Sequence, residues 1–273
     1  MLTRRSIWRA IRPMPLLLPI AACAAADPGP TGKVNVAALE ARTTAQVLDD
    51  WVKRVAQLSL GIAVRQQVVG REPAAGTVEY LAAMLNAVPR DEVYGLYIAF
   101  DSMSWRAPGS MPWVDRASWP KAAIVQYDFH DARQDWYAGA KRSGKLYITE
   151  PYFDDGGSNI TMVSVTRPVN DAAGRFFAVA GADISLEDVQ KHLKSTVGEI
   201  YLVSAAGRVI AHPNAQLRMS KAYPGEELRS LPGGALVAAS PSGNAFVPYG
   251  ASSRTLVWAT ASITGWKVVI SIP

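Results

Sequence analysis

The sequence predicts an α+β fold in which one long N-terminal helix precedes two groups of strands. From Val36 to about residue 68, apolar residues recur at helical intervals such as three and four, which is typical of one buried helix face. Beyond Pro89 the apolar period shortens to two, and Gly, Asp, Pro and Asn separate the apolar runs, as in sheets whose strands are joined by turns. With 49% apolar residues among 273, the chain can bury two modest cores.

Three helices are expected from this spacing and from the residues that cap or end helices. Gly70 and Pro89 end the first two, because glycine and proline interrupt a helical backbone. Thr77 and Ser185 are the expected N-caps of the second and third, because a hydroxyl accepts hydrogen bonds from the free amides of a first turn. The expected helices span residues 36–68, 77–87 and 185–197.

The expected strands form two groups, one on each side of the third helix. Turn sequences separate them, among them Asp171 to Gly174 in the first group and Ala205 to Gly207 in the second. The first group spans residues 93–100, 122–127, 143–150, 160–167 and 175–183, and the second spans residues 200–204, 208–213, 234–240, 245–250, 254–261 and 266–273.

The charge of the chain does not support nucleic-acid binding. A net charge of +5 and a pI of about 9.3 are basic overall. Residues 1–22 contain four arginines and no acidic residue, so the rest of the chain carries 5 minus 4, or +1. The remaining Lys and Arg residues are scattered, whereas phosphate backbones are bound by basic patches.

No catalytic or metal-binding motif is visible in the sequence. It has no serine in a nucleophile elbow, no glycine-rich phosphate loop and no Cys–His cluster with metal-ligand spacing. The histidines, His130, His192 and His212, lie far apart in the sequence, unlike metal ligands. We therefore expect a protein that is not an enzyme and that carries no metal or cofactor.

The N-terminus has the pattern of an export signal. Residues 1–22 begin with basic residues and end in a short apolar run, too short to cross a membrane as a helix of about 20 residues. Cys23 is the only cysteine and follows the run IAA, which resembles the bacterial lipobox whose thiol receives a lipid. We expect a lipoprotein signal peptide, a tether over residues 23–35 and a periplasmic location in the cell envelope. The alternative is cleavage after Ala26, which releases a soluble periplasmic protein.

Residues 131–186 carry the strongest functional signal. This segment combines aromatic residues with carboxylates between strand-like runs, a composition typical of a small polar pocket with aromatic walls. The aromatic residues that stand out are Trp136, Tyr137, Tyr147 and Tyr152.

Six motifs occur in an order that resembles the double Cache domains of bacterial extracytoplasmic sensors. They are DWY, GK, TEPYFDDGG, ITMVSV, VAGADISL and, later in the chain, YLVSAAGRVIAHP. The resemblance covers residues 36–273. It implies two PAS-like modules, each a central antiparallel sheet flanked by helices, with the long helix as a spine. Residues 36–198 would form the spine and the membrane-distal module, which usually binds the ligand, and residues 199–273 the smaller second module.

The resemblance also implies a set of ligand-binding positions. Members that bind amino acids hold the ligand amine with the Tyr and Asp of the PYxD motif and the Asp of GxDI, which here are Tyr152, Asp154 and Asp183. They hold the ligand carboxylate with a Trp, matched by Trp136, and an Arg two positions before it. This sequence has Gln134 at that position, with Arg133 one residue further away, so the carboxylate clamp departs from the family pattern.

The chemistry of these side chains favours a cation. Carboxylates in a partly dry pocket attract an ammonium group through charge-assisted hydrogen bonds, and aromatic faces add cation–π contact. If Arg133 reaches the pocket, it can pair a carboxylate and the ligand is an amino acid; otherwise an amine is favoured. Tyr127 is a candidate second wall. The expected ligand-binding residues are Tyr127, Arg133, Trp136, Tyr137, Tyr152, Asp154 and Asp183.

Each of these residues also has a purely structural interpretation. Trp136 and Tyr137 would simply fill the core under a loop. Asp183 would cap the following helix, and Asp154 would belong to a solvated turn. The tryptophan- and proline-rich loop that contains Trp113 would be either a lid over the pocket or a pinned surface loop.

The function expected from the sequence is that of a sensor for a small molecule: an amino acid, an amine or a small carboxylate. Because the sequence ends at Pro273, directly after the last expected strand, we expect a separate membrane protein to transmit the signal. The alternative is an envelope protein-interaction module with a non-functional pocket.

Overall fold

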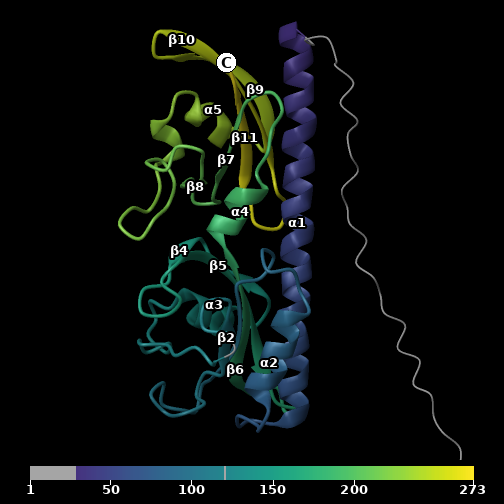
Figure 1. The fold of residues 1–273 in the computed structure, drawn as a ribbon, viewed down its shortest axis with the longest axis vertical. Helices are drawn as coiled ribbons and strands as arrows, with labels where there is room; N and C mark the ends of the chain where they lie inside the picture. The colour runs from purple at the N-terminus through teal and green to yellow at the C-terminus, as the bar shows by residue number, and fades with distance from the viewer. Residues whose placement is uncertain (1–28, 120) are drawn as a thin grey trace, which may run out of the picture.

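A computed structural model describes residues 29–119 and 121–273, and Figure 1 shows their arrangement. The expected signal peptide and Cys23 lie outside the described residues. Helix α1, Gly29–Val69, runs along the whole length of the molecule. The tether expected over residues 23–35 is therefore wrong from Gly29 onward. Pro30 lies in the first turn, where proline costs no hydrogen bond, so it does not delay the helix.

Two antiparallel sheets lie one after the other along α1 (Figure 1), which confirms the α+β fold with a spine helix. The first has the strand order β2-β1-β6-β5-β3, with β4 also paired to β5, and the second has the order β8-β7-β11-β10-β9. The first sheet's strands are β1 Gly95–Phe100, β2 Trp113–Asp115, β3 Tyr147–Ile148, β4 Tyr152–Phe153, β5 Thr161–Asn170 and β6 Phe176–Ser185. The second sheet's strands are β7 Glu199–Val203, β8 Val209–Ala211, β9 Ser242–Tyr249, β10 Ser252–Thr260 and β11 Lys267–Ile272.

Short helices complete two modules. The distal module contains the first sheet and lies farther from both described chain ends; the proximal module contains the second sheet (Figure 1). The remaining helices are α2 Thr77–Asn86, α3 Asp135–Ser143, α4 Leu186–His192, α5 Gly234–Ala239 and a 3₁₀ turn at Leu228–Ser230. Within the described ranges, no helix is long and apolar enough to cross a lipid bilayer.

Three expected strands differ from the structure. Residues 122–127 pair with no sheet, and residues 143–150 contribute only the end of α3 and the short β3. Residues 234–240 form α5 instead of a strand, because this segment is rich in alanine, which favours helix, and follows Gly233 at a φ of 75°.

The helix caps also differ in part. Thr77 does not cap α2: its hydroxyl donates to the Ala74 carbonyl, and Gly76 precedes the helix with no side-chain cap. Ser185 caps α4 as expected and accepts a hydrogen bond from the Glu187 amide. The helix ends at His192, earlier than the expected residue 197.

The two faces of the distal sheet have different partners. Leu96, Ile98 and Phe100 of β1 join the core that packs on α1, whereas Tyr97 and Ala99 join an aromatic cluster on the opposite face. Side chains of strand β6 alternate between the two faces in the same way, and Gly181 of β6 pairs with Tyr97. The face away from α1 is therefore where polar and aromatic side chains meet.

Candidate functional site

A small cavity lies on this second face of the distal sheet. It draws its walls from strands of the sheet, from α3 and from the long loops between them. The lining residues are Tyr97, Met111, Trp113, Tyr127, Trp136, Tyr152, Asp154 and Asp183. The cavity has a volume of about 10 Å³, which is roughly the room for one water molecule. A larger ligand requires the walls to move outward.

Strand register places Asp183 in the sheet-side wall. Its neighbours across the two adjacent strands are Gly95 and Ser164, and its side chain is buried, with the residue 3% exposed. The Ser164 hydroxyl donates to the Asp183 carboxylate over 2.6 Å, and it also lies 2.9 Å from the Tyr152 hydroxyl. Asp183 does not cap α4, because Ser185 holds that place.

Burial raises the pKa of Asp183 well above the ordinary value of a carboxyl group. The hydrogen bond from Ser164 opposes this effect, and the negative charges of Asp154 and Asp115 add to it. A cation placed beside Asp183 would stabilise its ionised form, so the site is electrostatically suited to a positively charged group.

Asp154 is held more completely by the protein. One carboxylate oxygen accepts a hydrogen bond from the Tyr127 hydroxyl over 2.8 Å, and the other accepts two from Ser158, through its amide and its hydroxyl. Burial, and then the charge of Asp154, raise the pKa of Tyr127 above its ordinary value. Gly157 is required beside it, because an added Cβ would lie 2.2 Å from an Asp154 oxygen.

Three buried donors in the cavity walls have no hydrogen bond of normal geometry to the described residues. They are the Tyr97 hydroxyl and the indole nitrogens of Trp113 and Trp136. The Tyr97 and Trp136 rings meet edge to face, with centroids 5.0 Å apart. Tyr97 still interacts with Ser164, and Trp136 with Tyr127, but without good hydrogen-bond geometry. A buried donor that lacks a hydrogen bond costs about 1–3 kcal/mol, so a ligand that supplies acceptor atoms would recover free energy here, most of all at Trp113.

The structure brings five of the seven expected residues together and places two elsewhere. Arg133 lies before α3 on the surface, with its side chain 88% exposed and paired with Asp131 over 2.6 Å. Tyr137 is buried beside the cavity but does not line it, and its hydroxyl donates to Asp101 over 2.6 Å. Gln134 directly precedes α3 and does not line the cavity. Among the described residues, those that line the cavity include no arginine or lysine.

The sequence-based prediction missed three residues of the cavity wall: Tyr97, Met111 and Trp113. The sequence could have indicated Tyr97, because side chains alternate along a strand and Tyr97 therefore faces away from Leu96 and Ile98. Trp113 belongs to the segment expected to be either a lid or a surface loop, but it lies in β2, at the edge of the sheet. No group of three potential metal ligands occurs within the described part of the chain.

A family model and several solved structures match this chain. The model for the first PDC sensor domain of proteins like methyl-accepting chemotaxis proteins covers residues 80–191, which contain the cavity. A solved structure named methyl-accepting chemotaxis protein X has a TM-score of 0.68 at 24% identity, covering 88% of this chain and 97% of that chain. The ligand-binding domain of the Pseudomonas aeruginosa receptor PctC, in complex with GABA, has a TM-score of 0.64 at 21% identity, covering 88% and 99%.

The chain has the double Cache fold. Its PDC-type sensor domain is related in sequence to the chemotaxis receptors PscA of Pseudomonas syringae (36% identity over 107 residues) and PctB of Pseudomonas aeruginosa (31% over 104). Each match covers 36% of this double Cache chain and 16% of the receptor. The matched family model describes a sensor domain, and both relatives are named as methyl-accepting chemotaxis proteins, of which this chain matches only a small part.

Proposed function

We propose that this protein is an extracytoplasmic sensor whose distal cavity binds a small molecule carrying an ammonium group, most favourably an amino acid. The observation that supports this proposal is that one cavity contains both the buried Asp183 carboxylate and three donors without a hydrogen bond of normal geometry, on Tyr97, Trp113 and Trp136. An acidic wall and a donor wall together match a molecule with a cation and a carboxylate.

The ammonium group of the ligand would bind at Asp183. This carboxylate accepts one side-chain hydrogen bond, from Ser164, among the described residues and retains capacity for more. Asp154 already accepts three side-chain or loop hydrogen bonds, so its role is to add negative charge and to fix the wall. The rings of Tyr97 and Trp136 offer cation–π contact to the same ammonium.

The carboxylate of the ligand would bind at the indole nitrogens of Trp113 and Trp136 and the Tyr97 hydroxyl. These donors are neutral, unlike the arginine at the position of Gln134 in the amino-acid-binding branch. Solved relatives hold GABA in PctC and L-Arg in PctB, each an amine with a carboxylate. This agreement in chemistry supports an amino acid as the first candidate.

An amine without a carboxylate is the second candidate. The composition of the cavity walls favours it, because the described lining residues include two acidic residues and no arginine or lysine. The surface position of Arg133 points the same way.

Thermal-shift measurements with GABA, n-butylamine and butyrate separate these candidates, since the three share a carbon chain and differ in their charged ends. We expect the largest Asp183-dependent rise in Tm with GABA or another amino acid, a smaller one with the amine and none with butyrate. A larger response to the amine would favour the second candidate. No Asp183-dependent response across a broad set of amino acids and amines would contradict the proposal.

The cellular part of the proposal is lipid anchoring through Cys23 and signalling through a membrane partner. Chemotaxis-receptor relatives support a signalling role, and the lipobox-like sequence supports the anchor. We expect Cys23→Ser to move the protein from the membrane fraction to the soluble fraction and to abolish labelling by a fatty-acid analogue. Unchanged labelling in the variant would contradict lipidation at Cys23.

A further inference from the structure

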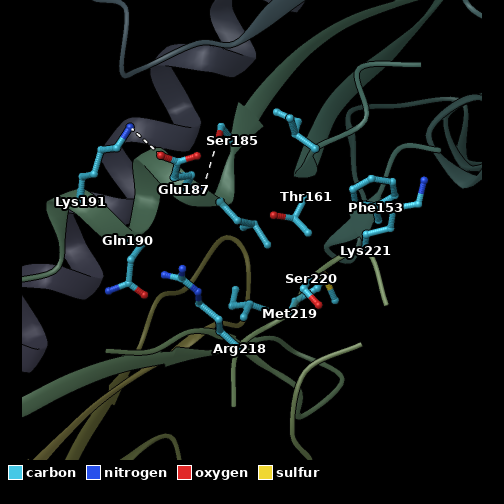
Figure 2. A pocket seen from close by; sticks show the side chains of 13 residues that line it. Phe153, Thr161, Ser185, Glu187, Gln190, Lys191, Arg218, Met219, Ser220 and Lys221 are labelled. Carbon is cyan, nitrogen blue, oxygen red and sulfur yellow. Dashed lines mark hydrogen bonds and ion pairs between the residues drawn. The ribbon is translucent and has the colours of Figure 1, made fainter. Parts of the chain in front are cut away.

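A second and larger cavity lies at the junction of the two modules, shown in Figure 2. Its volume is about 490 Å³, within the range of small-molecule sites, roughly 300–1,000 Å³. The distal module contributes the end of β6, α4 and residues of β4 and β5, and the proximal module contributes Ile210 of β8 and residues 218–221. The cavity is separate from the one that contains Asp183, and it belongs to both modules.

Arg218 is the unusual residue of this junction cavity. It is half-buried, and its guanidinium has no hydrogen-bond acceptor or ion-pair partner among the described residues. Figure 2 shows its side chain extending from the proximal module into the cavity, toward α4. The two lysines of the cavity are engaged: Lys191 pairs with Asp188 and Lys221 with Asp155, over 2.9 and 3.0 Å. Arg218 is thus a cation whose partner is not supplied by the described chain.

The polar groups around Arg218 suit an anion. Glu187 is the one carboxylate in the described lining, and Lys191 holds it over 3.3 Å. The Gln190 side chain also points inward, and its buried Oε1 has no hydrogen-bond partner. Because an amide can turn to present its NH₂ group instead, Gln190 can serve as a donor beside Arg218.

The rest of the cavity wall is mainly apolar. Its apolar side chains come from both modules: Phe153, Ile160, Leu186, Ile210 and Met219. An inorganic ion would leave this surface in contact with water, whereas an organic molecule would cover it and gain free energy from its burial.

We propose that the junction cavity binds a small organic carboxylate, with the carboxylate paired to Arg218 and the apolar body packed against the mixed wall. A planar guanidinium and a carboxylate form two parallel hydrogen bonds, which no lysine can reproduce. A molecule in this position contacts both modules at once and would fix their relative orientation. The two cavities share one segment of the chain. Tyr152 and Asp154 line the distal cavity. Their neighbours Phe153 and Asp155 contact Lys221 of the proximal module.

Isothermal titration calorimetry with benzoate and with hexanoate tests this proposal on the intact protein, with inorganic phosphate as the comparison. We expect both carboxylates to bind wild type. Arg218→Gln should weaken them about tenfold or more, because a charge-assisted hydrogen-bonded pair is lost. Arg218 makes no hydrogen bond or ion pair with the described residues, so the variant should fold with an unchanged Tm. Arg218→Lys, which keeps the charge, should have an intermediate affinity.

Two control variants test whether the loss of binding is specific to Arg218 and to the junction cavity. Arg229→Gln removes an exposed arginine of the same module outside the cavity and should leave binding unchanged. Asp183→Asn alters the distal site and should also leave benzoate binding unchanged, so this proposal can fail while the amino-acid proposal holds. The proposal is overturned if neither carboxylate binds, if Arg218→Gln binds them as well as wild type, if Arg229→Gln weakens them equally, or if phosphate binds as tightly.

Discussion

Asp183 is held in the distal cavity with its charge only partly compensated. Ser164 donates the one side-chain hydrogen bond that its carboxylate accepts from the described residues, while Asp154 and Asp115 lie close enough to raise its pKa. The folded protein therefore binds the Asp183 proton more tightly than the unfolded chain does. This single residue links ligand binding, stability and pH.

The stability of the ligand-free protein should depend on pH through Asp183. Because its pKa is raised on folding, its protonated form stabilises the fold fully below the unfolded value of about 4, and this contribution is lost as pH rises through the folded pKa. Asp183→Asn cannot ionise and should show a shallower loss of stability with rising pH. Urea unfolding of both proteins from pH 4 upward measures the difference. Parallel curves would contradict the raised pKa.

Sequence reasoning identified the acidic and aromatic wall residues but misplaced Arg133. Asp154 and Asp183 were predicted from the resemblance to the family's PYxD and GxDI motifs, and both line the cavity. Arg133 is only three residues from Trp136, yet it precedes the first turn of α3, and the backbone turns its side chain toward Asp131 at the surface. Distance along the chain does not determine direction at a helix start.

At the scale of single elements, β6 shapes the cavity through Gly181, a position without a side chain. Gly181 lies opposite Tyr97 in the strand pair, and an added Cβ would come within 2.2 Å of the Tyr97 ring. The glycine therefore gives Tyr97 the room to lie flat over the sheet and reach the cavity wall.

Gly181→Ala should destabilise the protein by about 1–3 kcal/mol and weaken ligand binding, because the Tyr97 ring must leave its position. Gly61→Ala in α1 is the matched control. Its Cβ would meet only Met84 at 3.7 Å, so it should stabilise the helix by about 0.5–1 kcal/mol. Chemical denaturation compares the two. Equal effects of the two substitutions would contradict the proposed role of Gly181.

The periodicity of the sequence predicted the strands that form complete ladders and failed where the local pattern was ambiguous. Strands β5 and β6 follow from long alternating runs and a tight turn at Asp171 to Gly174. The α3 segment contains only nine residues, and its buried face of Trp136, Tyr137 and Ala140 is too short to establish a helical period.

At the scale of the whole molecule, α1 holds the two modules in one body. Buried Asp49 accepts hydrogen bonds from the amides of Ser262 and Ile263 and from the Ser262 hydroxyl, which ties the spine to the loop between β10 and β11. Glu40 accepts hydrogen bonds from Ser195 and Thr196 in the segment that joins the modules. These contacts join residues more than 150 positions apart, so sequence spacing alone gives no sign of them.

Asp49→Ala should lower the free energy of unfolding by about 1–3 kcal/mol, since it leaves buried amides without their acceptor. Hydrogen exchange should accelerate in residues 261–267 before it does in the distal sheet. The neighbouring Asp50, which is exposed and pairs with Lys53, is the matched control, and Asp50→Ala should change little. Equal effects of the two substitutions would contradict a specific tie at Asp49.

The acidic cavity belongs to the distal module, which lies away from both described chain ends (Figure 1), and the junction cavity is lined by residues of both modules. The resemblance to double Cache domains predicted the two modules, but nothing in the sequence pattern indicated the space between them. Arg218 and Gln190 are 28 positions apart and meet only through the packing of the two modules.

Calorimetric titration of the amino acid that gives the largest thermal shift, into wild type and Asp183→Asn, tests the central claim most directly. Asparagine keeps the shape of the side chain and its hydrogen bond with Ser164 but removes the charge that binds the ammonium group. We predict that the variant folds and that its Kd is about tenfold to a hundredfold higher, the loss expected for a charge-assisted hydrogen bond. An unchanged Kd in a folded variant would contradict an ammonium-binding site at Asp183.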